Sequence, residues 1–346
     1  MEKVRVEDAV GKVLCHDLTR IVVGEGKSAA FKKGHIVSCD DVPMLLSMGK
    51  EHIFVFENKA GFIHEDEAAK RLSAICCGKN IIAGETSEGK IEHFCEIDGL
   101  FCVDSEALFK INSIGEIVIS TQKNYSPVKK NTLLAGAKVI PLLIDEKQLL
   151  EAEQTVSKPI LNVLPYKLKS AAIITTGSEV AKGLITDTFT PVIKEKLSCV
   201  GIKNITQQIT DDDIKNVRFA IENAVASKPD IILCTGGMSV DPDDNTPGAI
   251  KEVVNKNGGN LISYGAPVFP GAMFLLAYFA DGTPILGLPG CVMYAKTTLF
   301  DVLLPRIAAG IKITKPDIVK LGHGGLCLSG KGCAPPCHFP NCAFCK

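Results

Sequence analysis

Short apolar runs alternate with amphipathic stretches throughout the second half of the chain. Three runs have the length and apolar character of buried strands: residues 171–175, 205–209 and 231–234. Residues 188–197 and 211–226, which lie between these runs, place apolar side chains at helical spacing, and a later helix is expected over 291–309. Regular β-α alternation predicts a mostly parallel sheet covered by helices on both faces. We therefore expect a three-layer α/β/α domain over residues 170–312.

The beginning of the chain has a different pattern. Residues 6–18 carry apolar side chains at helical spacing and predict an opening helix. Asp40 and Asp41 can cap a short helix that runs to Met48, and residues 52–57 alternate as a strand does. These elements predict an N-terminal α+β segment over residues 1–60.

Residues 61–165 predict a mixed α+β region. Four elements are expected in it: helices over 65–76 and 148–156, and strands over 116–121 and 138–144. Turns that contain glycine, lysine and asparagine separate them. Residues 158–169 contain Pro159 and Pro165, which is typical of a linker. The sequence therefore predicts an α+β region that precedes the α/β/α domain.

Composition and charge narrow the possible partners. A chain of 346 residues is long enough for two or three domains, and its formal net charge is −1. Neither charge sign forms a long run, which argues against binding to nucleic acid or to a membrane surface. The longest apolar stretch, 265–280, is interrupted by Pro267 and Pro270 and is too short to span a bilayer. The N-terminus lacks the apolar core of a signal peptide, so we expect a cytoplasmic protein.

Three loops of similar design follow the first three strands of the α/β/α domain. The first reads TTGSE, the second contains Asp211-Asp212-Asp213, and the third reads TGGMSVDPDDNT. Loops at the carboxyl ends of parallel strands meet at one edge of the sheet. Glycines and hydroxyls suit phosphate oxygens, and the carboxylates of Glu179, Asp212 and Asp244 suit Mg²⁺. Carboxylates beside phosphates repel them unless a cation lies between, so a metal ion is implied.

Each of the first two loops has an ordinary structural explanation. Thr-Gly-Ser-Glu also fits a strand-to-helix turn with a capping serine. The aspartate triplet also fits a helix N-terminus, where acidic side chains interact favourably with the helix dipole. The third loop is more specific, because a glycine pair followed by several polar and acidic residues exceeds what ending a strand requires. The recurrence of the design after three successive strands favours a binding site.

The segments TTGSEV, the aspartate triplet, TGGMSVDPDDNTPGAI, PVFPGAMF and GLPGCVMYA together resemble the molybdopterin-binding domain over about residues 170–310. Molybdopterin molybdotransferases and molybdopterin adenylyltransferases share this domain. The resemblance implies that the loops bind the phosphate of molybdopterin, or of its adenylylated form, and hold Mg²⁺ and molybdate. It assigns cofactor binding to Thr176, Gly177, Ser178, Thr235, Gly236, Gly237, Ser239, Pro270, Gly271, Pro289 and Gly290.

The same resemblance assigns the catalytic or metal-binding role to Asp244, Asp212 and Glu179. Asp244 is the first choice, because it lies where the family has an acidic residue before the threonine. Residues 6–18 resemble, more weakly, the opening helix of the molybdotransferases. The family's Asp-Gly-Tyr-Ala motif, which brings an aspartate into the active site across a dimer, is absent from the sequence. Residues 31–57 instead resemble a segment of shortened, molybdopterin-binding relatives.

The C-terminal region, 320–346, is rich in cysteine. Its five cysteines are Cys327, Cys333, Cys337, Cys342 and Cys345. Glycine and proline between them disfavour a helix, and thiolates at this density can hold Zn²⁺ or an iron-sulfur cluster. The spacing fits no standard zinc finger or ferredoxin motif. A flexible tail with reactive thiols and a redox-active disulfide are the alternatives.

Two classes of function follow from these patterns. The first is an enzyme of molybdenum cofactor biosynthesis that binds molybdopterin with Mg²⁺ and inserts molybdate. The second is a non-catalytic carrier that delivers the cofactor to an apo-molybdoenzyme. A nucleotide pyrophosphatase of the competence-damage type, which shares the domain, ranks lower because those proteins usually begin with this domain. A homo-oligomer is a further expectation.

Overall fold

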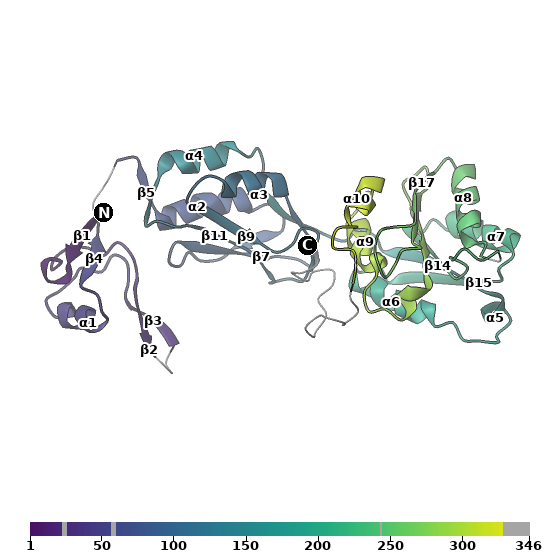
Figure 1. The fold of residues 1–346 in the computed structure, drawn as a ribbon, viewed down its shortest axis with the longest axis horizontal. Helices are drawn as coiled ribbons and strands as arrows, with labels where there is room; N and C mark the ends of the chain where they lie inside the picture. The colour runs from purple at the N-terminus through teal and green to yellow at the C-terminus, as the bar shows by residue number, and fades with distance from the viewer. Residues whose placement is uncertain (23–25, 57–59, 243, 328–346) are drawn as a thin grey trace. The chain divides into compact units, whose positions relative to one another are not determined.

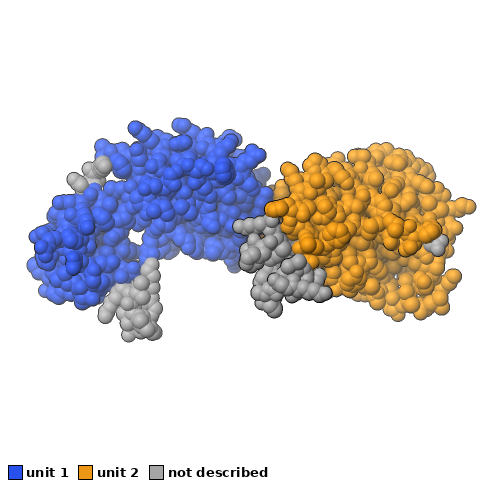
Figure 2. Space-filling view, viewed as in Figure 1, with its two compact units in different colours: residues 1–97, 101–124, 128–163 blue, residues 98–100, 125–127, 164–346 orange. Residues whose placement is uncertain are grey.

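The computed structural model describes residues 1–22, 26–56, 60–242 and 244–327. The chain divides into two compact units (Figure 2). One contains residues 1–97, 101–124 and 128–163, and the other contains residues 98–100, 125–127 and 164–346. Within the described ranges, no helix has both the length and the apolar character needed to cross a lipid bilayer.

The N-terminal part of the first unit is built from short strands and two short helices. In order they are β1 (Glu2–Arg5), the 3₁₀ helix η1 (Val6–Asp8), β2 (Leu18–Val22), β3 (Gly26–Phe31), α1 (Asp41–Ser47) and β4 (His52–Val55). β1 pairs antiparallel with β4, and β2 pairs antiparallel with β3. Val6, Leu14, Leu45 and Ile53 lie in the small core between them. The short helix and the strand predicted for residues 40–57 are confirmed.

The helix predicted over residues 6–18 is wrong. Only the η1 turn forms, and Gly11 follows it with a φ of +83°. Val13 and Leu14 form isolated bridges with Ile36 and Val55 instead of helical hydrogen bonds. The apolar residues here are buried by an irregular extended segment, and their spacing imitates that of a helix.

The middle of the chain is the mixed α+β region that the sequence predicts. Its elements are β5 (Phe62–His64), α2 (Glu65–Cys76), β6 (Ile81–Ala83), β7 (Lys90–Cys95), β8 (Gly99–Val103), α3 (Ser105–Asn112), β9 (Ile117–Thr121), β10 (Pro127–Val128), β11 (Leu133–Val139), β12 (Leu143–Asp145), α4 (Glu146–Gln154) and β13 (Leu161–Leu164). An antiparallel sheet has the order β6-β7-β11-β9, and Leu72 of α2 lies in the same core as Cys95 and Ala137 of this sheet.

Two predictions for this region differ from the structure. The strand expected over residues 138–144 is two strands, β11 and β12, with Pro141 between them. Proline has no N–H group and interrupts a strand ladder, which explains the break. The linker expected over residues 158–169 contains β13, whose Leu161 and Val163 are fully buried.

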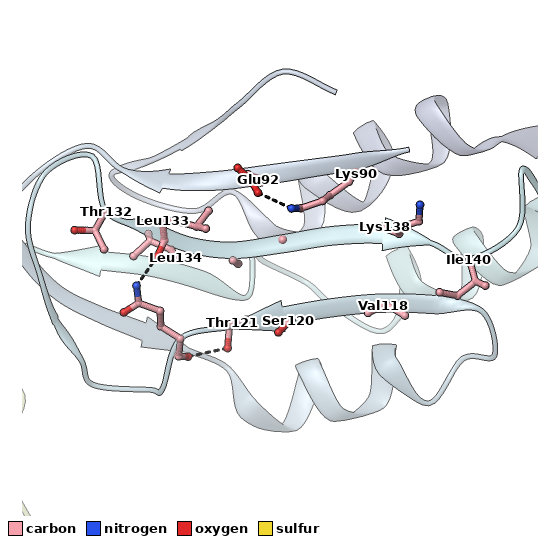
Figure 3. A pocket seen from close by; sticks show the side chains of 13 residues that line it. Lys90, Glu92, Val118, Ser120, Thr121, Thr132, Leu133, Leu134, Lys138 and Ile140 are labelled. Carbon is pink, nitrogen blue, oxygen red and sulfur yellow. Dashed lines mark hydrogen bonds and ion pairs between the residues drawn. The ribbon is translucent and has the colours of Figure 1, made fainter. Parts of the chain in front are cut away.

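The β6-β7-β11-β9 sheet also carries an open groove of about 690 Å³ (Figure 3). Side chains alternate between the two faces of a strand, so Lys90 and Glu92 lie on the face opposite the buried Ile91. The Lys90 ammonium contacts the Glu92 carboxylate at 2.5 Å, and the Lys138 ammonium donates to the Glu88 carbonyl at 3.0 Å. Each of these charged side chains therefore has a hydrogen-bond partner in the sheet or in the turn before β7.

The α/β/α domain predicted over residues 170–312 is confirmed as a fold (Figure 1). Its elements are β14 (Ser170–Thr176), α5 (Ser178–Ala181), α6 (Phe189–Cys199), β15 (Asn204–Thr210), α7 (Ile214–Ala226), β16 (Ile231–Thr235), α8 (Thr246–Lys256), β17 (Asn260–Tyr264), β18 (Leu275–Tyr278), β19 (Pro284–Leu288), η2 (Gly290–Met293), α9 (Leu299–Ala308) and α10 (Lys315–Lys320).

The sheet of this domain is mostly parallel and has the order β15-β14-β16-β19-β18-β17. β14 pairs in parallel with both β15 and β16, and β18 is antiparallel to its neighbours. The chain crosses from β14 outward to β15 and then back past β14 to β16. The strand order therefore reverses at β14 and β16, which is where open α/β sheets bind ligands.

Both faces of this sheet are covered by helices. Ile173 packs with Ile193 of α6 and Phe300 of α9 on one face. Ile174, the next residue, packs on the other face with residues of α7 and α8. The near-continuous apolar strands follow from this double burial. The helix predicted over 291–309 is shorter than expected, because a capping box of Thr298 and Asp301 starts α9 at Leu299.

Asp230 fastens the beginning of β14 to the beginning of β16. Its carboxylate accepts the Lys169 N–H at 2.7 Å, the Ser170 N–H at 2.8 Å and the Ser170 hydroxyl at 2.9 Å. Burial raises the pKa of Asp230, but these hydrogen bonds outweigh burial, so its pKa is lowered overall. The charged carboxylate therefore stabilises the fold above the unfolded-state pKa of about 4.

We expect Asp230→Ala to lower the free energy of unfolding by about 1–3 kcal/mol at pH 7, because three donors lose a charged acceptor. The deficit should shrink as the pH falls through the lowered folded-state pKa, where the wild-type carboxylate becomes protonated. Thermal unfolding at pH 7 and at pH 3 checks this. Asp281→Ala is the control, because Asp281 accepts one N–H, that of Thr283. An equal effect of the two substitutions would contradict the assignment.

Candidate functional site

The loop after β16 begins with a glycine turn. Gly236 and Gly237 both have a left-handed backbone, with φ angles of +85° and +51°. A Cβ atom added at Gly236 would lie 2.1 Å from the Thr176 carbonyl oxygen. A Cβ atom at Gly237 would lie 3.0 Å from the Thr246 hydroxyl. The turn therefore requires glycine for its backbone angles and for its close approach to the neighbouring loop.

Buried threonine hydroxyls join β14, β16 and α8 beneath this turn. The Thr176 hydroxyl donates to the Thr235 carbonyl at 3.1 Å and lies 3.0 Å from the Thr246 hydroxyl. All three side chains are almost fully buried. The Thr235 hydroxyl, just before Gly236, is a buried polar atom without a hydrogen-bond partner in the described residues. The carboxyl edge of the sheet therefore holds polar groups beside backbone that lacks Cβ atoms.

Asp212 lies in the second loop, after β15, and connects the first loop, after β14, with the third loop, after β16. Its carboxylate accepts the Ser178 N–H at 2.7 Å, and its carbonyl accepts the Asn245 side-chain amide at 2.9 Å. Asp213 caps α7 by accepting the Lys215 N–H at 2.8 Å. Asp212 is therefore the aspartate of the triplet that ties the first loop to the third, as the convergence of the loops requires.

A cavity of about 510 Å³ opens beside the glycine turn. The predicted site residues Gly236, Gly237, Ser239, Asp244, Pro289 and Gly290 line it. Asp244 is the acidic side chain among the described residues that line the cavity. Burial and the negative charge of Asp244 both raise the pKa of Tyr264, whose hydroxyl donates to the Met238 carbonyl at 3.2 Å. The Tyr264 hydroxyl is therefore protonated at pH 7, as an ordinary tyrosine is.

Other predicted site residues lie outside the cavity lining. Thr176, Gly177, Ser178 and Thr235 stand behind the glycine turn or in the adjacent loop, and Glu179 is exposed on α5. Pro270 follows a cis peptide bond after Phe269, and Gly271 is buried, with a Cβ position 2.9 Å from Leu299. The Pro270-Gly271 segment supports the cavity, because the next residues, Ala272 and Met273, line it.

Metal ligation by three side chains does not appear in the described part of the chain. No group of three or more His, Cys, Asp or Glu side chains lies together there. The Asp212 carboxylate is engaged by the Ser178 N–H, which leaves Asp244 as the acidic side chain facing the cavity. This donor set fits Mg²⁺, which commonly takes one or two carboxylates and completes its shell with water and substrate phosphate oxygens.

The cysteine-rich tail falls largely outside the described residues. Four of its cysteines are outside the described residues, so their predicted metal binding stays a prediction: Cys333, Cys337, Cys342 and Cys345. Cys327 is described and half-buried, and its N–H donates to the Phe269 carbonyl at 2.8 Å.

Sequence reasoning missed most of the apolar residues that line the cavity. Phe189, Met238, Met273, Cys291, Met293 and Tyr294 line it together with the predicted residues. Met273 and the segment 291–294 lie within motifs that were recognised for their glycines and prolines alone. Burial raises the pKa of the Cys291 thiol, so this thiol is neutral at pH 7.

Asp187 was also missed. Its carboxylate accepts the Phe189 N–H at 2.9 Å and the Gln207 side-chain amide at 2.7 Å, and Thr175 donates to it at 3.3 Å. Burial raises the pKa of Asp187, but its hydrogen bonds lower it overall. Asp187 therefore positions the start of α6, whose Phe189 lines the cavity.

The structure thus has an α/β/α domain with a cavity where the strand order reverses. A model of the family described as probable molybdopterin binding domain matches residues 172–309, which confirms the resemblance of this part of the chain to that family. A second model, described as a domain of unknown function (DUF8806), matches residues 3–57.

Curated relatives match parts of this chain. A CinA-like protein of Pseudothermotoga lettingae is 39% identical over 85 residues, which are 25% of this chain and 21% of that protein. Gephyrin of Dictyostelium discoideum is 31% identical over 163 residues, which are 42% of this chain and 22% of gephyrin. The chain thus spans about a fifth of the length of each of these two relatives.

Solved structures align with less than half of the chain. The molybdopterin biosynthesis Mog protein from Mycobacterium ulcerans is 24% identical with a TM-score of 0.34, covering 41% of this chain and 97% of that one. The tungsten cofactor synthesizing protein MoaB from Pyrococcus furiosus is 22% identical with a TM-score of 0.35, covering 43% and 98%.

The glycine turn yields a matched pair of substitutions. Gly236→Ala adds a Cβ against the Thr176 carbonyl oxygen, whereas Gly282→Ala, at a φ of +90°, meets no atom within 4 Å. Both substitutions strain the backbone by roughly 1–2 kcal/mol. Gly236→Ala should lower the free energy of unfolding by a further 1–3 kcal/mol or so, because the neighbouring strand must shift. Urea unfolding compares the two, and equal losses would show that the close approach does not stabilise the fold.

Proposed function

We propose that the α/β/α domain binds molybdopterin, or its adenylylated form, in the cavity beside Gly236 and Gly237, and that the protein acts in molybdenum cofactor biosynthesis. The observation that carries the proposal is the joint placement of the glycine turn and Asp244 at one cavity, on a domain of the matching family. The turn offers backbone free of Cβ atoms, and the cavity has a volume suited to a small organic ligand.

The phosphate end of the ligand would lie at the glycine turn. Gly236 and Gly237 allow a phosphate to approach the backbone closely. The N-terminus of α8, at Thr246, lies directly under Gly237, and the unpaired N–H groups and dipole of a helix N-terminus attract anions. Ser239, on the exposed side of the same loop, adds a hydroxyl. These groups support anion binding on one side of the cavity.

Asp244 is the carboxylate that we assign to Mg²⁺. A Mg²⁺ ion shared between Asp244 and the ligand's phosphate oxygens would supply positive charge where phosphoanhydride cleavage develops negative charge. Asp212 holds the first loop in place through the Ser178 N–H, and it acts on the site through that loop. Glu179 is exposed on α5, so a role for it requires a movement of that helix or a bound ligand that reaches it. Molybdate would be the substrate that is inserted.

An enzyme and a carrier make different predictions for the same cavity. The enzyme releases AMP when adenylylated molybdopterin is mixed with Mg²⁺ and molybdate, whereas the carrier binds the ligand and delivers it unchanged to an apo-molybdoenzyme. Asp244 suits the enzyme, because a Mg²⁺ ion held by it would supply positive charge where cleavage of a phosphoanhydride develops negative charge. Location in the cytoplasm, assembly into a homo-oligomer and metal binding by the tail cysteines remain expectations from the sequence.

We expect Asp244→Asn to lower the rate of AMP release by about 100-fold or more, since it removes the charge that holds the cation at the phosphates. Release of AMP from adenylylated molybdopterin, followed by chromatography, checks this. Asp281→Asn, a change in the turn between β18 and β19, is the control and should release AMP at the wild-type rate.

The same assay separates the alternatives. Tight binding of adenylylated molybdopterin by the wild type without AMP release would support the carrier and contradict the enzyme. Hydrolysis of a nucleotide pyrophosphate that lacks a pterin, at a rate comparable with AMP release, would favour the pyrophosphatase.

A further inference from the structure

The two edges of the six-stranded sheet in the α/β/α domain are built differently. β17, at one edge, is interrupted by a bulge between Leu261 and Ser263, and the Lys315 ammonium of α10 donates to the Ser263 hydroxyl at 2.6 Å. β15, at the other edge, pairs with β14 over seven consecutive residues without a bulge. Its sequence, NITQQIT, contains no proline and no charged residue. Bulges, prolines and charges keep edge strands from pairing with other chains, so β15 lacks the protection that β17 has.

The backbone of β15 presents hydrogen-bonding groups to its open side. The Thr210 carbonyl accepts the Gly177 N–H at 3.1 Å, on the side of β14, so the even-numbered residues of β15 turn their backbone groups toward β14. Successive residues of a strand turn these groups alternately to opposite sides. The N–H and C=O groups of Ile205, Gln207 and Ile209 therefore point away from the sheet. No described residue forms a hydrogen bond with them there.

These three outward-facing residues are arranged symmetrically about Gln207. In an antiparallel pair of two β15 strands centred on Gln207, Ile205 of one copy lies opposite Ile209 of the other, and all seven residues are paired. Outward-facing residues then lie opposite each other, as the hydrogen-bonded pairs of an antiparallel ladder require. The pairing also brings the side chain of Ile209, which is 45% exposed, beside an apolar partner. The strand is therefore complementary to a second copy of itself.

Charged residues flank the strand with the same symmetry. Lys203 stands four residues before Gln207, and Asp211 stands four residues after it. The centred register therefore places Lys203 of each copy opposite Asp211 of the other. Opposite charges directly across a strand pair are stabilising, and like charges are destabilising. Lys203 is exposed, and the Asp211 carboxylate is held in position by the Asp213 N–H and the Asn216 side-chain amide.

We propose that the protein forms a two-fold symmetric dimer in which the β15 strands of two copies pair antiparallel about Gln207 and join their sheets into one. The partner is a second copy because both the outward backbone groups and the flanking charges match the strand's own sequence. The assembly ends at two copies, since the opposite edge of each sheet carries the bulge of β17. This dimer goes beyond the proposed function, because none of its contacts uses a residue of the cavity.

Sedimentation equilibrium of the full chain over about a hundredfold range of concentration measures the dimer, whose population follows mass action. The wild type should pass from monomer to dimer as its concentration rises. Lys203→Asp places a carboxylate opposite Asp211 in both flanking pairs, and should raise the dissociation constant of the dimer about tenfold or more. Lys320→Asp, a charge reversal at an exposed position of α10, is the matched control and should dimerise as the wild type does.

A charge exchange tests the register. Asp211→Lys alone places a lysine opposite Lys203 and should also weaken the dimer. An equal mixture of Lys203→Asp and Asp211→Lys should form a heterodimer with about the wild-type dissociation constant, because both flanking pairs again have opposite charges. Ile209→Lys changes one exposed side chain and puts a charge on the edge strand. It should weaken the dimer whether or not Asp211→Lys folds.

Each outcome decides for or against the dimer. A concentration-dependent dimer that Lys203→Asp and Ile209→Lys weaken, and that the mixture restores, supports it. A wild type that stays monomeric over the whole range overturns it. A dimer that neither variant weakens also overturns it, because the two copies would then meet on another surface. Weakening that the mixture does not restore, with both variants folded by circular dichroism, overturns the register centred on Gln207.

Discussion

The close approach of Gly236 to the Thr176 carbonyl oxygen is the constraint on which the candidate site depends. It brings the end of β16 against the end of β14, where the strand order of the sheet reverses. The Thr176 hydroxyl then reaches both the Thr235 carbonyl and the Thr246 hydroxyl, so the start of α8 is held at the same place. The cavity beside the turn follows from this packing, and a side chain at Gly236 would push its walls apart.

The polar and the apolar residues that line the cavity come mostly from separate parts of the chain. The polar residues belong to one continuous loop, which the glycine pair shapes. The apolar residues come from the segments around Met273 and Met293, which the sheet brings to the same edge from β18 and β19. Asp212 and Asp187 do not line the cavity. Each holds a neighbouring segment in place, because its carboxylate accepts a backbone N–H of that segment. A site of this kind depends on residues outside the cavity that hold its loops by hydrogen bonds, as well as on the residues that line it.

The fold of the second domain could be predicted from its sequence because its strands are buried on both faces and therefore read as apolar runs. The helix predicted over residues 6–18 fails because an irregular buried segment repeats the same spacing. The three loops could be predicted to converge, since parallel strands end at one edge. The direction of each carboxylate could not be predicted: the Asp212 carboxylate accepts the Ser178 N–H, whereas Asp244 lines the cavity. The methionines that line the cavity were missed because, in a sequence, an apolar side chain in a cavity wall looks like one in a core.

The central claim is that one ligand occupies the cavity with its phosphate at the glycine turn. A crystal structure of the full chain with molybdopterin and Mg²⁺ tests this most directly. The account predicts the phosphate at the backbone of Gly236 and Gly237 and the metal ion at Asp244. A ligand bound elsewhere on the chain, or one whose phosphate lies away from the glycine turn, would contradict it.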